Sequence, residues 1–386
     1  MIRKFLVEER IEYLLLTIEY LSVPNITLNP KAYPRNLPTL LFQLIQHPKK
    51  IQNISLRFFQ AFLYIDIKMM KFYNVFTLKR EFIMKNLKIL APVDFSDLSA
   101  KGLKAANNLA KLFNGSVTPF HAYIPLTDLD GFHYMGSGFT SQENLTDIEK
   151  VITQRLLDIA ADHVDVGHLN DGMLGIGNPA HAIVETSVDF DMIVMSTHGR
   201  TGFTRFLLGS VAEKVLRMSH KPVLVVEDDS TLVPMQKIMV TTDFSTNSEA
   251  AFPWAKKIAE TTGAEIDLFH AVIYDEFESV EKAESTFEIR KESLKKIAET
   301  AFAGLNSKVN IRIKTTDRSA QDAILQQTKE EYYNLVVIST IGRTGFDYLM
   351  LGSTASSVTR LVKAAVLSVS TEKQIEKKLE IIKDSP

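Results

Sequence analysis

The sequence predicts two copies of one α/β domain, each an open parallel sheet with helices on both of its faces. The segment from Leu87 to Ser99 returns 149 residues later, from Gln236 to Ser248. The segment from Ser196 to Phe203 returns as residues 339–346, now with an offset of 143. Within each copy, short apolar runs alternate with longer amphipathic segments, as expected for strands that are joined by helices.

The elements of the first copy can be assigned in order. The apolar run 87–93 predicts a buried strand that ends at Asp94, and Ser96 and Ser99 are both suitable N-caps for the helix that follows. Because helices separate the strands, we expect right-handed crossovers and a parallel sheet. The later elements are strand 116–123, helix 142–163, strand 170–175, helix 179–187, strand 191–195, helix 211–219 and strand 222–226.

Composition excludes several classes of protein. The 386 residues contain no cysteine, which removes disulfides, thiolate zinc sites, iron–sulfur clusters and thiol nucleophiles. The formal net charge of −2 gives no electrostatic reason to expect nucleic acid as a partner. No apolar run reaches the roughly 18–20 residues that a membrane span needs. We therefore expect a cytoplasmic protein with no membrane partner.

Residues 1–83 differ from the rest of the chain. They contain none of the 17 glycines, and 12 basic residues against six acidic ones. A folded domain without glycine lacks the usual supplier of positive φ at turns and helix ends. Our hypothesis is a non-native or poorly ordered extension that precedes a start at Met84; the alternative is a small helical module that binds a partner. The predicted domains are then 84–229 and 235–371, followed by a charged tail, 372–386, read as a solvated helix or a frayed end.

The loop after the strand 191–195 carries the strongest chemical signal. Gly199 is followed by nine residues and then by Gly209 and Ser210, directly before a helix. Glycines that flank a loop at a helix N-terminus let backbone N–H groups and the helix dipole face an anion such as phosphate. Asp94, at the end of the first strand, is placed to accept hydrogen bonds from an adenine amino group or a ribose hydroxyl, although it is also a candidate cap for the first helix.

At these residues, both copies resemble universal stress proteins of the UspA type. The resemblance covers roughly 87–227 and 236–370. The ATP-binding pattern of that family is Gly, two residues, Gly, nine residues, then Gly-Ser or Gly-Thr, and here Ser196 and Ser339 stand in place of the first glycine. The resemblance implies five-stranded Rossmann-like sheets of the adenine nucleotide alpha hydrolase type. It also implies that two domains pair through their last strands, here within one chain, with a homodimer as a further option.

The resemblance further implies ATP, with or without Mg²⁺, as the ligand and assigns its contacts. In the first copy, the residues around adenosine are Pro92, Asp94, Ala122 and Met195, and His198 lies near the ribose. Gly199, Gly209, Ser210 and Val211 hold ribose and phosphates. In the second copy, which we expect to bind more weakly, the matching residues are Asp243, Ile338, Gly342, Gly352, Ser353 and Thr354.

The two copies differ near this site. The second copy has Asp317 and Ser319 where the first has Gly177 and Pro179, and Ile341 where the first has His198. A carboxylate beside a polyphosphate repels it, so the first copy is the better candidate for binding.

Three functions remain open from the sequence. The first is a nucleotide-binding switch or scaffold of the stress response with no catalytic residues, the second a nucleotide-free dimerisation module, and the third a slow ATP hydrolase. The histidines show no metal-ligand spacing, so no metal site is expected. His121 and His270, which end the second strands, are expected to be structural.

Overall fold

The computed structural model describes residues 86–124, 142–197, 208–227, 230–274, 280–342 and 351–384. The chain divides into two units, Met1–Arg80 and Glu81–Pro386, and both repeats belong to the second unit. The hypotheses about residues 1–83, and the predicted contacts of His198 and Gly199, fall outside the described residues.

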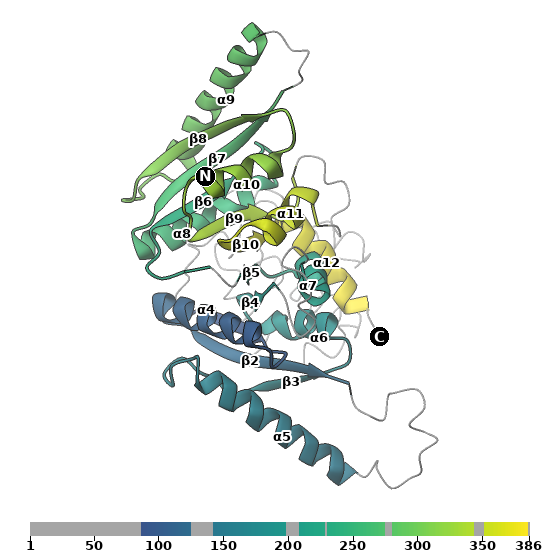
Figure 1. The fold of residues 1–386 in the computed structure, drawn as a ribbon. Coiled ribbons are helices and arrows are strands. Elements are labelled where there is room, and N and C mark those ends of the chain that lie inside the picture. The colour runs from purple at the N-terminus through teal and green to yellow at the C-terminus, as the bar shows by residue number, and fades with distance from the viewer. Residues whose placement is uncertain are drawn as a thin grey trace, which may run out of the picture. The chain divides into compact units, whose positions relative to one another are not determined.

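The first repeat has the predicted order of strands and helices (Figure 1). Helix α4 begins at the predicted cap: the side chain of Ser96 accepts a hydrogen bond from the backbone N–H of Ser99. Helix α4 ends at Asn114, whose left-handed backbone terminates it. The elements are β1 (Lys88–Pro92), α4 (Asp97–Phe113), β2 (Ser116–Tyr123), α5 (Gln142–Ala161), β3 (Met173–Ile176), α6 (Pro179–Thr186), η4 (Ser187–Asp189), β4 (Met192–Ser196), α7 (Ser210–Met218) and β5 (Val223–Val226).

The second repeat follows the same order and then adds one helix. Its elements are β6 (Lys237–Thr241), η5 (Ser248–Ala250), α8 (Ala251–Thr262), β7 (Glu265–Ile273), α9 (Val280–Ala301), β8 (Val309–Thr316), α10 (Ala320–Glu330), β9 (Leu335–Ser339), α11 (Ser353–Leu361), β10 (Ala365–Val369) and α12 (Glu372–Asp384).

The two repeats share one ten-stranded sheet with the order β3-β2-β1-β4-β5-β10-β9-β6-β7-β8. All pairings within a repeat are parallel, whereas β5 and β10 are antiparallel, with Leu224 opposite Leu367. The predicted pairing of the last strands within one chain is therefore observed. Because β5 and β10 run in opposite directions, the carboxyl ends of the strands lie at one edge of the sheet in the first repeat and at the opposite edge in the second.

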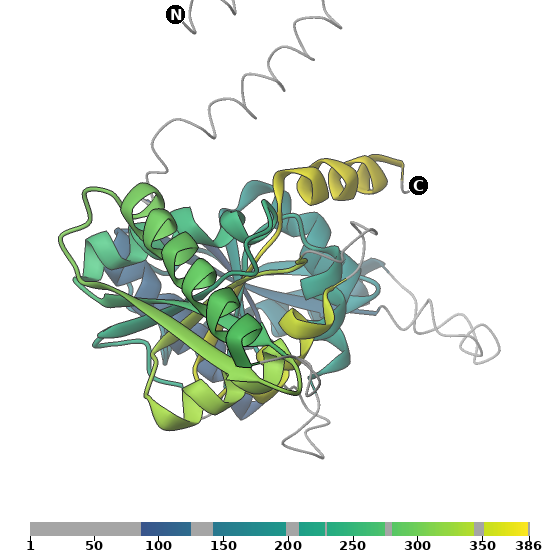
Figure 2. The same cartoon turned by 90° about the horizontal axis from the view of Figure 1, so that it is seen from above.

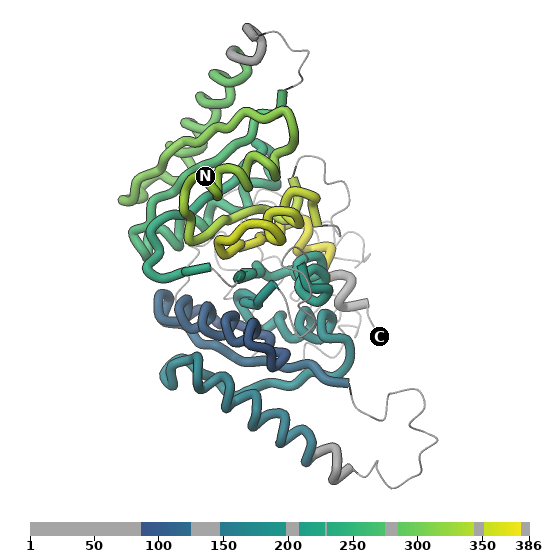
Figure 3. The backbone as a smooth tube through the Cα atoms, viewed as in Figure 1, coloured from purple at the N-terminus to yellow at the C-terminus, as the bar shows by residue number. Residues whose placement is uncertain are grey.

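Helices cover both faces of this sheet (Figure 2). On one face, a single apolar cluster runs through α4, α5, α8 and α9 and continues across both repeats. On the other face, α6 and α7 cover the first repeat and α10 and α11 cover the second, each pair with a cluster of its own. Figure 3 follows the backbone from the first repeat, in blue and teal, into the second, in green and yellow. The continuous cluster and the paired strands make the two repeats one folded unit.

The C-terminal tail differs from our expectation of a solvated or frayed segment. Residues 372–384 form α12, and two polar side chains on one face of this helix, Gln374 and Lys378, are 0 % and 3 % exposed. Glu372, Lys373 and Glu376 are exposed. The reading as a fully solvated helix is wrong for the buried face, because that face packs against the junction of the two repeats.

Candidate functional site

The turn after β1 is shaped by Asp94. Its Oδ1 accepts hydrogen bonds from the backbone N–H of Ser96 at 3.1 Å and from the Ser96 hydroxyl at 2.5 Å. Asp243 holds Ser245 in the same way, at 3.0 and 2.5 Å. Since the serine caps the helix and the aspartate holds the serine, the alternative in which Asp94 itself caps α4 is wrong. The aspartate instead fixes the turn at the carboxyl end of the first strand of each repeat.

An aromatic stack that sequence reasoning missed supports this turn. Phe95 has a φ of 64°, in the left-handed region that bulky side chains rarely adopt. Its ring lies 4.4 Å from the ring of His121, whose Nδ1 donates to the Val93 carbonyl at 2.7 Å. The Arg155 guanidinium lies over the ring of Phe95, 4.7 Å from its centroid.

The second repeat contains the same stack. Phe244 also has a φ of 64°, and its ring lies 4.3 Å from that of His270 and 5.2 Å from the Arg290 guanidinium. The Nδ1 of His270 donates to the Thr242 carbonyl at 2.8 Å. The recurrence at equivalent positions indicates that the stack holds the strained turn, which agrees with the structural role expected for His121 and His270.

Removing the histidine from this stack is expected to destabilise the fold. We expect His270→Ala to lower the free energy of unfolding by about 1–2 kcal/mol, since one hydrogen bond and one aromatic pair are lost together. Urea denaturation measures this difference, and His163→Ala, at a half-buried histidine after α5, is the control. Equal stability of the His270 and His163 variants would contradict this role of the stack.

In both repeats, a backbone hydrogen bond joins the residues on the two sides of the predicted phosphate loop. The Gly209 N–H donates to the Thr197 carbonyl at 2.7 Å, and Gly352 bonds to Thr340 at the same distance. The two glycines are the N-caps of α7 and α11, and neither helix start receives a side-chain capping bond from its N-cap. Ser210 and Ser353, the first helical residues, are exposed. The helix N-terminus at each loop therefore presents backbone donors and a hydroxyl at the carboxyl edge of the sheet.

In the second repeat, the structure brings two predicted site residues into contact. A Cβ built on Gly342 would lie 2.6 Å from Oδ2 of Asp243. The loop backbone thus approaches this carboxylate so closely that only glycine fits at this position. The side-chain amide of Asn247 donates to the Gly342 carbonyl at 3.1 Å and ties the loop to the turn after β6. The turn and the loop thus form one site.

The remaining predicted residues lie on the strands and helices that lead to this edge. Three of them are at or near the ends of strands: Pro92 ends β1, Ala122 is next to last in β2, and Met195 is next to last in β4. Ile338 holds the position of Met195 in β9, and both side chains are buried. Val211 and Thr354 are the second residues of α7 and α11.

The turn after the third strand differs between the repeats, but not by the residue matches that the sequence predicted. Gly177 has a φ of 100°, which glycine tolerates, and Asn178 caps α6. The predicted match of Ser319 with Pro179 is wrong, because Ser319 is the N-cap of α10 just as Asn178 is the N-cap of α6. Asp317 and Arg318 lie between β8 and this cap, and the φ of Asp317 is not positive. There Ser319 caps α10, and its hydroxyl donates to Asp322 at 2.5 Å. The backbone of this turn therefore takes a different path in the two repeats.

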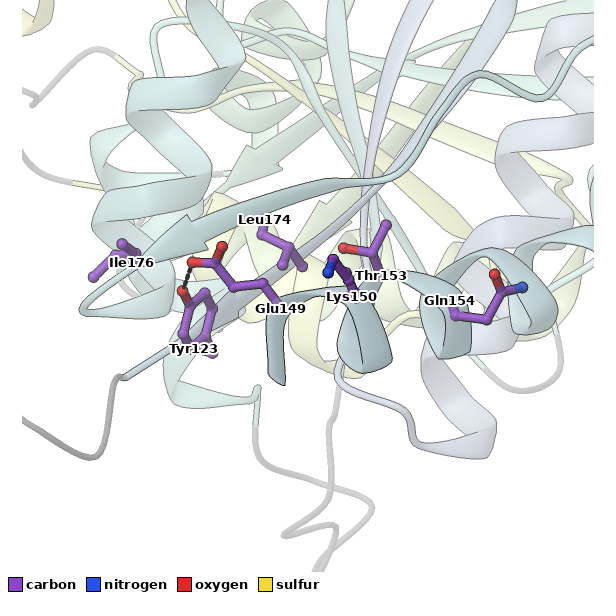
Figure 4. A pocket seen from close by; sticks show the side chains of 7 residues that line it. All are labelled: Tyr123, Glu149, Lys150, Thr153, Gln154, Leu174 and Ile176. Carbon is purple, nitrogen blue, oxygen red and sulfur yellow. Dashed lines mark hydrogen bonds between the residues drawn. The ribbon is translucent and has the colours of Figure 1, made fainter. Parts of the chain in front are cut away.

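A separate pocket of about 560 Å³ opens between α5 and the ends of β2 and β3 (Figure 4). Tyr123 donates a hydrogen bond to Glu149 across it, and burial, together with this carboxylate, raises the pKa of Tyr123 to about 12. No predicted nucleotide-binding residue lines this pocket, and nothing in the sequence pattern indicated it. Its lining residues are Tyr123, Glu149, Lys150, Thr153, Gln154, Leu174 and Ile176.

Within the described ranges, no group of three or more histidine, aspartate or glutamate side chains is arranged to hold a metal ion. In the same part of the chain, no helix combines the length and apolar character that crossing a membrane requires.

Comparisons with known proteins agree with the duplicated fold. The model of the universal stress protein family matches residues 85–227 and 234–370. A universal stress protein of Methanocaldococcus jannaschii is 37 % identical over 36 % of this chain and 81 % of its own length. One from Mycolicibacterium smegmatis is 24 % identical over 73 % of this chain and 96 % of its own. The crystal structure of a universal stress protein from Archaeoglobus fulgidus superposes with a TM-score of 0.53, covering 74 % of this chain and 97 % of that one at 21 % identity, and so shares the fold. The chain is thus a member of the universal stress protein family that carries two of the family's domains in tandem.

Proposed function

We propose that the chain binds ATP, or a related adenine nucleotide, at the carboxyl edge of the first repeat, and that it acts as a nucleotide-dependent switch or scaffold rather than as an enzyme. The observation that carries this proposal is the start of α7. Gly209 is the N-cap of this helix and forms no side-chain capping bond, and the exposed Ser210 follows as the first helical residue. A helix start of this kind attracts phosphate through its unpaired N–H groups and its dipole.

The surroundings of α7 fit the rest of a nucleotide. Ala122 and Met195 lie on β2 and β4, which both pair with β1, and Asp94 lies in the turn that follows β1. This is the crevice between adjacent strands in which open parallel α/β sheets bind their ligands. Apolar Ala122 and Met195 suit a purine ring, and the carboxylate of Asp94 suits an amino or hydroxyl donor.

The second repeat is proposed to bind the nucleotide more weakly. It also has a glycine as the N-cap of α11, but the turn before α10 carries the carboxylate of Asp317, whereas the turn before α6 carries Gly177 and no carboxylate. A further negative charge near a polyphosphate reduces affinity. The loop in this repeat already rests on Asp243, because Gly342 lies against its carboxylate.

A switch rather than a hydrolase is proposed because the carboxylate next to the loop has a structural task. Asp94 holds the N–H and the hydroxyl of Ser96, whereas general-base catalysis requires a carboxylate or histidine within hydrogen-bond reach of the attacking water. Mg²⁺ would then arrive with the nucleotide, coordinated by its phosphates.

The test uses the full chain after purification. We expect denaturation to release adenine nucleotide, identified by ion-exchange chromatography, and incubation with ATP and Mg²⁺ to release no phosphate beyond a single turnover. Sustained release of phosphate over many turnovers would favour the hydrolase. If the purified chain releases no nucleotide and binds none that is added, the nucleotide-free scaffold is favoured.

A further inference from the structure

Helix α12 begins at the base of the second phosphate loop. The N–H of Thr371 donates to Oε1 of Gln374 at 3.0 Å, and the N–H of Gln374 donates back to the Thr371 hydroxyl at 3.3 Å. This reciprocal pair is a capping box. The same Oε1 accepts a hydrogen bond from the hydroxyl of Thr340 at 2.6 Å. Thr340 also holds the N–H of Gly352 with its carbonyl, so the first turn of α12 is bonded to the residue on which that loop closes.

One turn further along, the same face of α12 reaches the first repeat. Lys378 donates from Nζ to the carbonyl of Ser219 at 2.8 Å and to the hydroxyl of Ser370 at 3.0 Å. Ser219 is the C-cap of α7, and Ser370 follows β10. Because β5 and β10 are antiparallel, the C-terminal end of α7 lies at the edge where the second repeat has its loop. Helix α12 therefore bridges the two repeats (Figure 1).

The amine of Lys378 is buried, and a second buried base, His220, lies near it. Burial lowers the pKa of Lys378 to about 7. His220, next to Ser219, is 4 % exposed, and neither of its ring nitrogens has a hydrogen-bond partner within the described part of the chain. Burial, with Lys221 and Lys378 nearby, lowers the pKa of His220 to about 4. Burial also lowers the pKa of Lys221, partly offset by Asp191 and Asp189.

Four charged side chains in the described part of α12, namely Glu372, Lys373, Glu376 and Lys377, are exposed, so solvent screens their charges from the buried amine. The polar partners of the amine are a carbonyl and a hydroxyl, both neutral. A neutral amine can be buried here because its hydrogen bonds are made, whereas an ammonium ion also loses the hydration that stabilises its charge in water.

We propose that protonation of Lys378 controls the docking of α12 onto the junction of the two repeats. In this latch, α12 is docked firmly while the side chain of Lys378 is neutral, and its docking is weakened when Lys378 is protonated. The docked state binds fewer protons than the undocked state, in which Lys378 regains an ordinary pKa. Docking is therefore strengthened as the pH rises from about 7 to 10 and weakened as it falls through the same range. Undocking removes Gln374 from Thr340 and so frees the base of the second phosphate loop.

Hydrogen exchange measured by mass spectrometry on the full chain tests the latch without any nucleotide. After correction for the intrinsic pH dependence of exchange, we expect the protection of the amides in 372–384 to rise at least about tenfold between pH 6.5 and pH 8.5. In Lys378→Met, which fills the same space without a titrating group, we expect high protection at both pH values. The matched control, Lys373→Met, changes an exposed lysine of the same helix and should behave as the unmodified chain.

Two results would overturn the proposal. One is equal corrected protection of α12 at the two pH values in the unmodified chain, and the other is an unchanged pH dependence in Lys378→Met. The amides of α11, 353–361, report on the second loop. We expect their protection to change together with that of α12, and constant protection there while α12 opens would refute the connection to the loop.

Discussion

Replacing Asp267 by alanine is expected to lower the free energy of unfolding by about 2–3 kcal/mol, since the buried acceptor of three hydrogen bonds is lost, while Glu331 continues to pair with Lys237 and Arg312. Asp267 lies on β7 and is 0 % exposed. It accepts hydrogen bonds from Tyr333 at 2.7 Å, Asn310 at 2.8 Å and Arg312 at 3.0 Å. The ammonium of Lys237 lies 3.2 Å away.

The pH dependence of this effect follows from the same contacts. Burial raises the pKa of Asp267, but the hydrogen bonds from Asn310, Tyr333 and Arg312 outweigh it and hold the pKa below its usual value. A carboxyl with a lowered pKa in the folded state stabilises the fold at neutral pH, and this contribution is lost as the pH falls below about 4. The difference between Asp267→Ala and the unmodified chain should therefore shrink in acid.

Urea denaturation at pH 7 and at pH 3 measures both effects. The control is Asp147→Ala, which removes a carboxylate from an exposed ion pair with Lys150, whose side chains are 73 % and 72 % exposed. Such pairs contribute little, so we expect no measurable change there. A midpoint for Asp267→Ala equal to that of the control would show that the network does not stabilise the second repeat.

Replacing Gly209 by valine is expected to lower the affinity for ATP at least about tenfold, which is about 1.4 kcal/mol of binding free energy. The equivalent Gly352 shows the reason, because a Cβ there would lie 3.0 Å from the carbonyl of Thr340, which accepts the hydrogen bond that closes the loop, and would displace the base of the loop. The φ of Gly209 is −58°, which valine adopts without backbone strain, so we expect a local displacement rather than loss of the fold.

Two further glycine variants make this result specific. Gly352→Val removes the corresponding approach in the second repeat and should have a smaller effect, since that repeat is the weaker site. Gly167→Val is the neutral control, because a Cβ there meets no atom within 4 Å. If Gly209→Val binds ATP as tightly as Gly167→Val does, the first repeat is not the binding site.

The sequence was sufficient to predict the order of elements and the repeat. Apolar runs and caps such as Ser96 are local signals, and each predicted element of the first repeat has its counterpart within a few residues. The pairing of β5 with β10 was predicted from the resemblance to a family rather than from the residues. The strands themselves, such as Val223–Val226, are apolar throughout and do not reveal which neighbour they pair with.

Other features depend on contacts between distant residues and had no local signal. The stack of Phe95 with His121 requires the ends of β1 and β2 to be adjacent, and the left-handed backbone of a phenylalanine contradicts its own preference. The docking of α12 was missed because Lys378 reads as a surface residue in a charged segment. The Thr371 and Gln374 spacing of a capping box was the one signal available for it.

Titration calorimetry of the full chain with ATP and Mg²⁺ tests the central claim most directly. The account predicts one equivalent of ATP bound in the first repeat, which is lost in Gly209→Val and retained in Gly352→Val. Any second, weaker equivalent should be lost in Gly352→Val and retained in Gly209→Val. Absence of binding heat, from a chain that also carries no nucleotide through purification, would contradict the account.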